Sequence, residues 1–247
     1  MIAHIFYYLI KGINKIAGLS FGFSHDGEDL ILLKYLSNIK RGKYIDIGSN
    51  FPVSASNTFL LYLYGWNGVC IDPLPFLKQK YRLIRSRDKF INAAVFGSRN
   101  INQKDLKFYY YKNIPGNSTF DQERVEHLRK NFNREPTSII NVPKISIRDI
   151  LTSFDDKEKT DINLLNLDIE GFEIDILNEF FYLKKFPWVI CVEEIGKTAD
   201  SIKNGEIYKI MKNNGYILGA RTFLSSIYVL NKKLYDLPSD FIKELEV

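Results

Sequence analysis

A carboxylate, a glycine turn and a second carboxylate follow one another at the ends of two predicted strands. Asp46 lies in the apolar run 43–47, which ends at Gly48, and Asp72 ends a second apolar run, 68–71. In open α/β sheets ligands bind at the carboxyl ends of the strands, and an acidic residue roughly 25 positions after the glycine turn typically meets ribose hydroxyls. The spacing therefore predicts a site for a nucleoside cofactor.

The residues after Gly48 indicate a cofactor without phosphates. Dinucleotide sites need G-x-G-x-x-G for close approach to a pyrophosphate, whereas here Ser49, Asn50 and Phe51 follow Gly48. Asp46 can face an ammonium group, and the backbone at Gly48 can lie beside an adenosine. These features favour S-adenosylmethionine, with the alternative that Asp46 caps the following helix.

A second group of carboxylates follows two later predicted strands. Asp168 comes directly after the run 162–167, Glu170 lies two residues further on, and Glu193 ends the run 188–192. They could act as a general base, bind substrate hydroxyls, or, for Asp168 and Glu193, hold a divalent cation through oxygen ligands. The alternative for Asp168 and Glu170 is that they cap the next helix.

Two further titratable residues, His25 and Glu194, are weaker candidates. His25 has a side chain suited to general-base catalysis, but it lies in a predicted N-terminal loop. Glu194 is expected to face solvent.

Strands and helices alternate along the chain and then give way to a terminal hairpin. This order predicts an α/β, Rossmann-like, doubly wound and mostly parallel sheet with a C-terminal antiparallel hairpin. Helices are expected at 27–37, 55–64, 75–87, 121–131, 147–153, 172–180 and 202–212, and strands at 43–47, 68–71, 90–96, 106–111, 141–145, 162–167, 188–192, 216–223 and 227–230.

The first 23 residues are predicted to form an amphipathic helix that precedes a single domain at 24–247. Apolar residues fall on one helical stripe, whereas Lys11 and Lys15 interrupt any transmembrane span. We expect this helix to cover the domain or to join two subunits of a homo-oligomer. The alternative is peripheral contact with a membrane surface.

Composition narrows the functional classes. The 247 residues carry a net charge of +5, and the basic stretch 78–89 has apolar residues at helical spacing. It is expected to be an exposed helix face, so no nucleic-acid partner is predicted. Cys70 and Cys191 lie in predicted strands, where they are expected to be core residues of a cytoplasmic protein in a reducing compartment.

An ordered set of motifs resembles the FkbM family of S-adenosylmethionine-dependent methyltransferases, from about residue 24 to residue 230. The matching segments are Ser24-His25-Asp26-Gly27-Glu28-Asp29-Leu30, Tyr44-Ile45-Asp46-Ile47-Gly48-Ser49-Asn50, Ser56-Asn57-Thr58, Gly65-Trp66-Asn67-Gly68, Ile71-Asp72-Pro73, Asn92-Ala93-Ala94-Val95, Asn117-Ser118-Thr119-Phe120, Leu167-Asp168-Ile169-Glu170-Gly171 and Ile190-Cys191-Val192-Glu193.

The resemblance implies roles for individual residues. The methionine side of the cofactor would lie against Asp46, Gly48, Ser49 and Asn50, the ribose against Asp72 with Pro73 beside it, and the adenine against Asn92 and Ala93. Two positions depart from the family pattern: Asp72 stands where Glu is more frequent, and His25 stands where Gln is usual.

The resemblance also implies an activity, because members of the family are mostly O-methyltransferases of sugars and natural products. We expect methyl transfer to a sugar hydroxyl of a glycan, a polysaccharide precursor or a related natural product. The alternatives are a methyltransferase for nucleic acid or another small molecule, an NAD-dependent oxidoreductase, and a non-catalytic protein with a cofactor fold. Residues 116–136 are expected to border the acceptor.

Overall fold

The computed structural model describes residues 5, 6, 8, 12, 20–97, 105–114, 117–154, 161–169, 171–195 and 198–232. Most of the predicted N-terminal helix, 1–23, lies outside these residues. One of its described members, Phe6, places its ring 6.2 Å from that of Phe59. No helix within the described ranges is long and apolar enough to cross a membrane.

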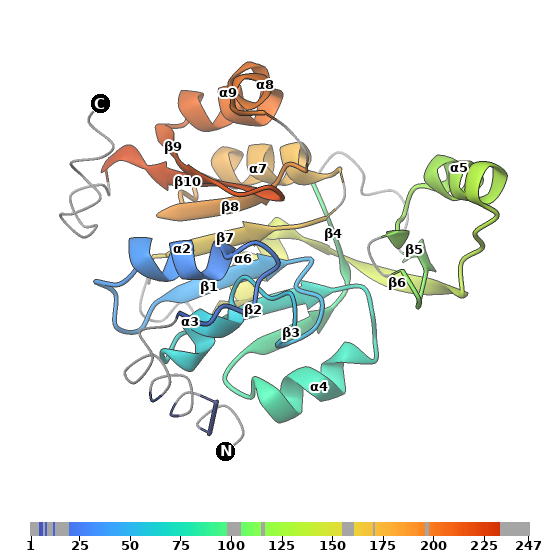
Figure 1. Cartoon of the computed structure of the whole chain (residues 1–247), viewed down its shortest axis with the longest axis horizontal. Helices are drawn as coiled ribbons and strands as arrows, with labels where there is room; N and C mark the ends of the chain where they lie inside the picture. The colour runs from blue at the N-terminus through green and yellow to red at the C-terminus, as the bar shows by residue number, and fades with distance from the viewer. Residues whose placement is uncertain are drawn as a thin grey trace.

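A seven-stranded sheet forms the centre of the molecule (Figure 1). Its order is β3-β2-β1-β7-β8-β10-β9, and β10 runs antiparallel to both of its neighbours. The predicted mostly parallel sheet with a C-terminal antiparallel hairpin is therefore confirmed. The strands are β1 (Lys43–Ile47), β2 (Asn67–Asp72), β3 (Lys89–Asn92), β7 (Leu164–Leu167), β8 (Val189–Glu193), β9 (Tyr216–Arg221) and β10 (Ser225–Leu230).

The two faces of this sheet are covered by different helices because neighbouring side chains in a strand point to opposite faces. On one face Ile45, Leu165 and Ile190 pack with α6 (Ile147–Ser153), α7 (Glu173–Tyr182) and α9 (Glu206–Asn213). On the other face Tyr44, Leu164 and Val189 pack with α2 (Glu28–Tyr35), α3 (Phe59–Leu63) and α4 (Leu77–Ile84). Both predicted core cysteines, Cys70 and Cys191, are free and buried.

A second sheet has three strands in the order β4-β6-β5. They are β4 (Ala94–Phe96), β5 (Asp105–Tyr110) and β6 (Ser138–Ser146), and α5 (Gln122–Phe132) lies between β5 and β6 in the chain. Figure 1 shows β5, β6 and α5 projecting to one side of the main sheet.

Three sequence predictions about elements were wrong. The single strand expected at 90–96 is divided, because β3 pairs with β2 whereas β4 pairs with β6 in the second sheet. The helix expected at 55–64 begins only at Phe59, since Ala55 adopts a left-handed φ of 57° that no helix continues. The helix expected at 202–212 is two helices, α8 (Ala199–Asn204) and α9, separated by an extended Gly205.

The prediction of an exposed face at 78–89 was also wrong in one respect. Arg85, which ends α4, is fully buried.

Candidate active site

A cavity of about 570 Å³ opens at the carboxyl ends of the parallel strands, within the usual size range of small-molecule sites. The structure brings eight of the predicted site residues to its wall: His25, Gly48, Asn50, Asp72, Pro73, Ala93, Asp168 and Glu193. These residues come from six different segments of the chain. Their convergence follows from the parallel sheet, which brings the strand ends to one edge.

The Gly48 turn is packed against the end of β7. Gly48 has a φ of 79°, and its N–H donates to the Ile71 carbonyl at 2.9 Å. A Cβ at this position would lie 1.8 Å from the Asp168 carbonyl oxygen. Only glycine fits here, so the backbone itself forms this part of the cavity wall.

Asp72 presents a buried carboxylate to the cavity. Its two oxygens accept hydrogen bonds from Asn50 N–H and Leu74 N–H, both at 2.9 Å. Burial raises the pKa of this carboxyl from 3.8 to about 7, and the two backbone donors oppose the rise only in part. Each oxygen keeps a second lone pair, so the group can still accept hydrogen bonds from a ligand.

Three of the predicted cofactor residues are not part of the cavity wall. Asp46 is buried, and its oxygens accept hydrogen bonds from Thr58 Oγ1 at 2.5 Å and Asn166 Nδ2 at 2.9 Å. Asn92 donates from Nδ2 to the Asp72 carbonyl at 3.0 Å, and Ser49 is buried within the turn. The structure therefore places Asp46 behind the Gly48 turn, outside the cavity wall. It is also not the cap of α3, whose N-cap residue is Thr58.

Two buried polar atoms of the turn have no hydrogen-bond partner among the residues that the structure describes. They are Ser49 Oγ and Asn50 Oδ1, and Asn50 lines the cavity. A buried acceptor without a partner is costly, so its presence at a cavity wall fits a bound ligand with hydrogen-bond donors. Together with the bare Gly48 backbone and the Asp72 carboxylate, it fits the amino-acid and ribose groups of S-adenosylmethionine.

Three of the four catalytic candidates line the same cavity. Asp168, Glu193 and His25 all line it, whereas Glu170 lies outside the described residues. Asp168 is fixed at the end of β7 by its N–H, which donates to the Ile47 carbonyl at 3.0 Å. Asp168 is not the cap of α7, whose N-cap residue is Phe172 and which has no side-chain cap; the Glu173 carboxylate accepts from Gly171 N–H before the helix begins.

No metal site is formed by the part of the chain that the structure describes. It contains no group of three or more His, Cys, Asp or Glu side chains that could hold a metal ion. Glu194 corrects another expectation, because it is buried beneath β10 and accepts a hydrogen bond from Tyr228 at 3.3 Å.

Sequence reasoning did not assign a role to several residues of the cavity wall. Glu28 is buried and accepts hydrogen bonds from Thr222 Oγ1 at 2.6 Å and Asp26 N–H at 3.0 Å. Asn57 donates to Asn166 Oδ1 at 2.9 Å. Both lie in segments that resemble the family pattern, which was the only signal for them.

Besides Phe51, four phenylalanines line the wall: Phe96, Phe108, Phe120 and Phe172. The rings of Phe96 and Phe172 are 5.0 Å apart, and those of Phe108 and Phe120 are 4.7 Å apart. Of the described residues in the predicted acceptor segment 116–136, Ser118, Thr119 and Phe120 line the cavity.

A sheet of this order with one reversed strand, and a cavity at its carboxyl edge, is the class I methyltransferase fold. The profile described as "Methyltransferase FkbM domain" matches residues 46–218, well over half of the chain. The protein therefore belongs to the FkbM family of S-adenosylmethionine-dependent methyltransferases.

Three solved structures are similar at low sequence identity. A TehB-like SAM-dependent methyltransferase from Corynebacterium glutamicum is 11% identical, with 92% of this chain and 98% of that chain covered and a TM-score of 0.40. An O-methyltransferase from Bacillus cereus in complex with SAH is 10% identical, with 91% and 90% covered and a TM-score of 0.42. A precorrin-6y C5,15-methyltransferase from Geobacter metallireducens is 12% identical, with 81% and 84% covered and a TM-score of 0.37. No curated protein matched the sequence.

Proposed function

We propose that this methyltransferase transfers a methyl group to a sugar hydroxyl of a glycan, a polysaccharide precursor or a related natural product. The observation that carries the proposal is the polar part of the cavity, where Glu28, Asn57, Asp168 and Glu193 share one wall with the cofactor candidates. Carboxylate and amide oxygens accept hydrogen bonds, and a sugar presents several hydroxyl donors. The family's usual acceptors support the same choice.

Cofactor binding is assigned to the wall residues of β1, β2 and the segment after β3. Gly48 and Asn50 would hold the amino-acid part of the cofactor, Asp72 the ribose hydroxyls, and Pro73 and Ala93 the adenine. When bound, S-adenosylmethionine supplies a methyl group already activated by a positively charged sulfur. The protein's own task is then to align the acceptor and to take up its proton.

Asp168 is the proposed general base. Its strand end is packed directly against the Gly48 turn, so a carboxylate and the cofactor-binding backbone meet at one point of the cavity. Asp168 would accept the hydroxyl proton of the acceptor as the acceptor oxygen takes the methyl group that the cofactor would supply. Glu193, Glu28 and His25 would orient the acceptor through hydrogen bonds to its other hydroxyls.

The test combines an acceptor screen with an isosteric variant. Monosaccharides, sugar nucleotides and isolated glycans are incubated with labelled S-adenosylmethionine, and methyl transfer is measured for wild type, Asp168→Asn and the exposed control Asp200→Asn. We expect Asp168→Asn to lower kcat by about 10²-fold, the scale of a lost general base, with the affinity for S-adenosylhomocysteine retained. The Asp200→Asn control should match wild type.

A chelator separates the two roles considered for Asp168 and Glu193. Activity that survives the chelator and falls in Asp168→Asn supports the base. Activity that is lost with the chelator and restored by Mg²⁺ would assign the carboxylates to a cation instead. Methylation of nucleic acid with no sugar acceptor would overturn the proposed substrate class.

A further inference from the structure

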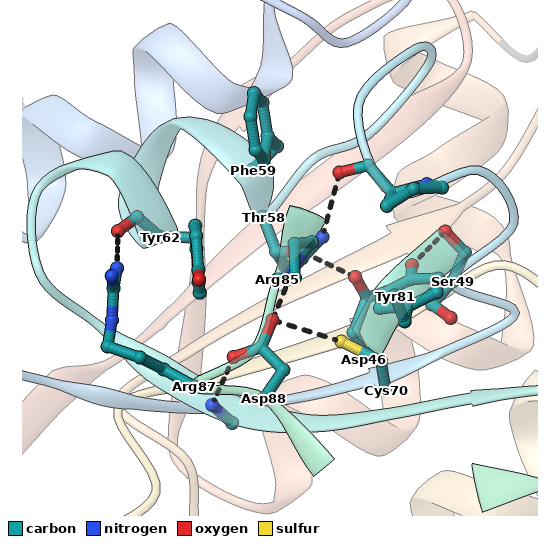
Figure 2. A network of polar contacts seen from close by, with 12 residues as sticks. Asp46, Ser49, Thr58, Phe59, Tyr62, Cys70, Tyr81, Arg85, Arg87 and Asp88 are labelled. Atoms are coloured by element: carbon teal, nitrogen blue, oxygen red, sulfur yellow. Dashed lines mark hydrogen bonds and ion pairs between the residues drawn. The ribbon is translucent and has the colours of Figure 1, made fainter. Parts of the chain in front are cut away.

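A fully buried ion pair lies behind the cofactor turn, on the side away from the cavity. Arg85 and Asp88 side chains are 0% exposed, and Arg85 Nε is 2.6 Å from Asp88 Oδ2. Figure 2 shows this pair surrounded by aromatic rings and polar side chains of β1, β2, α3 and α4. Removing two charges from water is costly, so the pair must be compensated by its hydrogen bonds.

Most of the remaining guanidinium bonds go to one segment, the loop from residue 49 to residue 58 that joins β1 to α3. Arg85 Nη1 lies 3.5 Å from the Pro52 carbonyl and 3.2 Å from Ser56 Oγ, and Nη2 lies 2.9 Å from Thr58 Oγ1. Nη2 also donates to the Tyr44 hydroxyl at 2.8 Å. A single planar group therefore ties three points of the loop to β1.

The two sides of this loop have different partners. Asn50, Phe51, Ser54, Ala55 and Asn57 line the cavity, whereas Pro52, Ser56 and Thr58 contact Arg85. Tyr81 adds a further tie, because its hydroxyl donates to the Ser49 carbonyl at 3.1 Å (Figure 2).

The backbone of the loop needs such support. Asn50 and Ala55 adopt φ values of 48° and 57°, which L-residues seldom take without surrounding contacts. The loop also carries Asn50, which lines the cavity and whose Oδ1 has no hydrogen-bond partner among the described residues. Holding the loop before the ligand arrives removes the entropic cost of ordering it on binding.

The contacts behind the loop extend to Asp46. Thr58 Oγ1 accepts from Arg85 and donates to Asp46, which also accepts from Asn166. Asp88 in turn accepts from the Tyr44 hydroxyl and from Gly68 N–H at 2.9 Å. The polar side chains behind β1 thus form one connected set, with Arg85 at its centre.

We propose that Arg85, held by Asp88, is a positioning residue that preorganises the loop 49–58 for S-adenosylmethionine without touching the cofactor. It acts through Pro52, Ser56 and Thr58, and its loss weakens cofactor binding beyond any loss of stability. The inference rests on the loop's assignment to the cofactor.

The experiment compares Arg85→Lys and Arg85→Met with the matched control Arg87→Met. Arg87 lies two residues away and is exposed. Its guanidinium stacks on the Tyr62 ring, 3.8 Å from the ring centroid, and donates to the Tyr62 carbonyl, which belongs to α3 rather than to the loop 49–58 (Figure 2). The dissociation constant of S-adenosylhomocysteine is measured by calorimetry at a temperature where circular dichroism shows each variant folded. Hydrogen–deuterium exchange of the segment 49–58 is followed with and without the ligand.

We expect Arg85→Met to raise the dissociation constant by about 10-fold to 100-fold, the scale on which small misplacements act in binding sites. Arg85→Lys should recover part of the affinity, because an ammonium group can pair with Asp88 but cannot span both sides of the guanidinium fork. Exchange at 49–58 should accelerate in the ligand-free variants and slow again with S-adenosylhomocysteine. Arg87→Met should bind like wild type.

Ser56→Ala keeps the inference testable if the Arg85 variants do not fold. It leaves Arg85 and Asp88 in place and removes the two hydrogen bonds that Ser56 Oγ accepts, from Arg85 Nη1 and from Phe59 N–H, so a weaker but measurable loss of affinity is expected. Equal affinities and equal exchange at 49–58 in the folded variants, with only a lower melting temperature, would overturn the positioning role while leaving the methyltransferase assignment intact. A wild-type protein that binds no S-adenosylhomocysteine would overturn both.

Discussion

At the scale of single residues, Asp72 is the group whose environment is most informative. It must be ionised to accept two ribose hydroxyls well, yet burial raises its pKa to about 7. Its nearest donors are backbone N–H groups of Asn50 and Leu74, which do not change charge with pH. The protonation state of this one carboxyl should therefore control cofactor affinity near neutral pH.

The expected pH dependence follows from which form binds the ligand. Below about pH 7 the ligand-free carboxyl carries a proton, which the ribose hydroxyls must displace, so binding releases a proton and weakens as pH falls. We expect the dissociation constant of S-adenosylhomocysteine to rise by about tenfold per pH unit below pH 7 and to level off above it. Calorimetry across this pH range, in two buffers of different ionisation enthalpy, would measure the dissociation constant and the number of protons released on binding.

Asp72→Asn serves as the control for the ligand's own titration, because the amide keeps the shape of the side chain but does not ionise. The variant should bind more weakly at pH 8 and show little of the dependence below pH 7. An identical pH profile in wild type and Asp72→Asn would remove Asp72 from the ribose site.

At the scale of elements, the contact between the β1 turn and the end of β7 determines the shape of the cavity. Gly48 lacks a Cβ in a place where one would meet the Asp168 carbonyl oxygen, and Asp168 begins the segment that leads to α7. A change in the turn must therefore move the β7 end, and with it the proposed base.

Gly48→Ala should be much more harmful than an alanine at another glycine of the same conformation. Gly215 has a φ of 81°, close to the 79° of Gly48, but a Cβ there would meet nothing within 4 Å. Gly215→Ala should cost about 1–2 kcal/mol in the free energy of unfolding, the penalty for a left-handed alanine. Gly48→Ala should cost more and also abolish most S-adenosylhomocysteine binding, as measured by urea denaturation and calorimetry. Equal losses in the two variants would contradict the close packing against Asp168.

At the scale of the whole molecule, the segment before α2 is fastened to the C-terminal hairpin. Thr222 Oγ1 donates to Glu28 Oε1 at 2.6 Å, Leu224 N–H donates to Asp26 Oδ2 at 3.1 Å, and the Tyr35 hydroxyl donates to the Gly219 carbonyl at 2.8 Å. The cavity is thereby closed by residues from the two ends of the described domain, including His25, Leu224 and Ser225.

Thr222→Val tests this closure. The substitution keeps the shape of the side chain but removes the hydrogen bond to the buried Glu28 carboxylate and the one from Ser225 N–H. We expect a loss of about 1–3 kcal/mol in the free energy of unfolding. Thr152→Val is the control, since Thr152 is an exposed residue of α6 whose hydroxyl donates to the Asp149 carbonyl. Denaturant midpoints of the two variants should differ clearly. Coincident midpoints would show that the hairpin contact contributes no more than a surface hydrogen bond.

Much of the architecture could be predicted from the sequence because its signals are local. Apolar runs such as 43–47 and 188–192 define buried strands, and the residues that follow them define the carboxyl edge of a parallel sheet. Gly48, Asp72, Asp168 and Glu193 were therefore predicted to meet at one edge, and the structure places all four at one cavity.

Partner choice among polar side chains depended on contacts between distant segments. Arg85 lies in a basic stretch that by itself is typical of an exposed helix face, yet its partners Thr58, Ser56 and Tyr44 lie 27, 29 and 41 positions earlier. Asp46 was predicted to face the ligand, and in the structure its carboxylate accepts hydrogen bonds from Thr58 and Asn166. A position in a strand specifies the end of the sheet but not which neighbours will bond the carboxylate. The chain's local pattern determined where each group would be, since backbone periodicity is set by neighbouring residues. Only the tertiary structure decided which group each would bond, because the elements packed around a buried polar atom determine which partners lie within its reach.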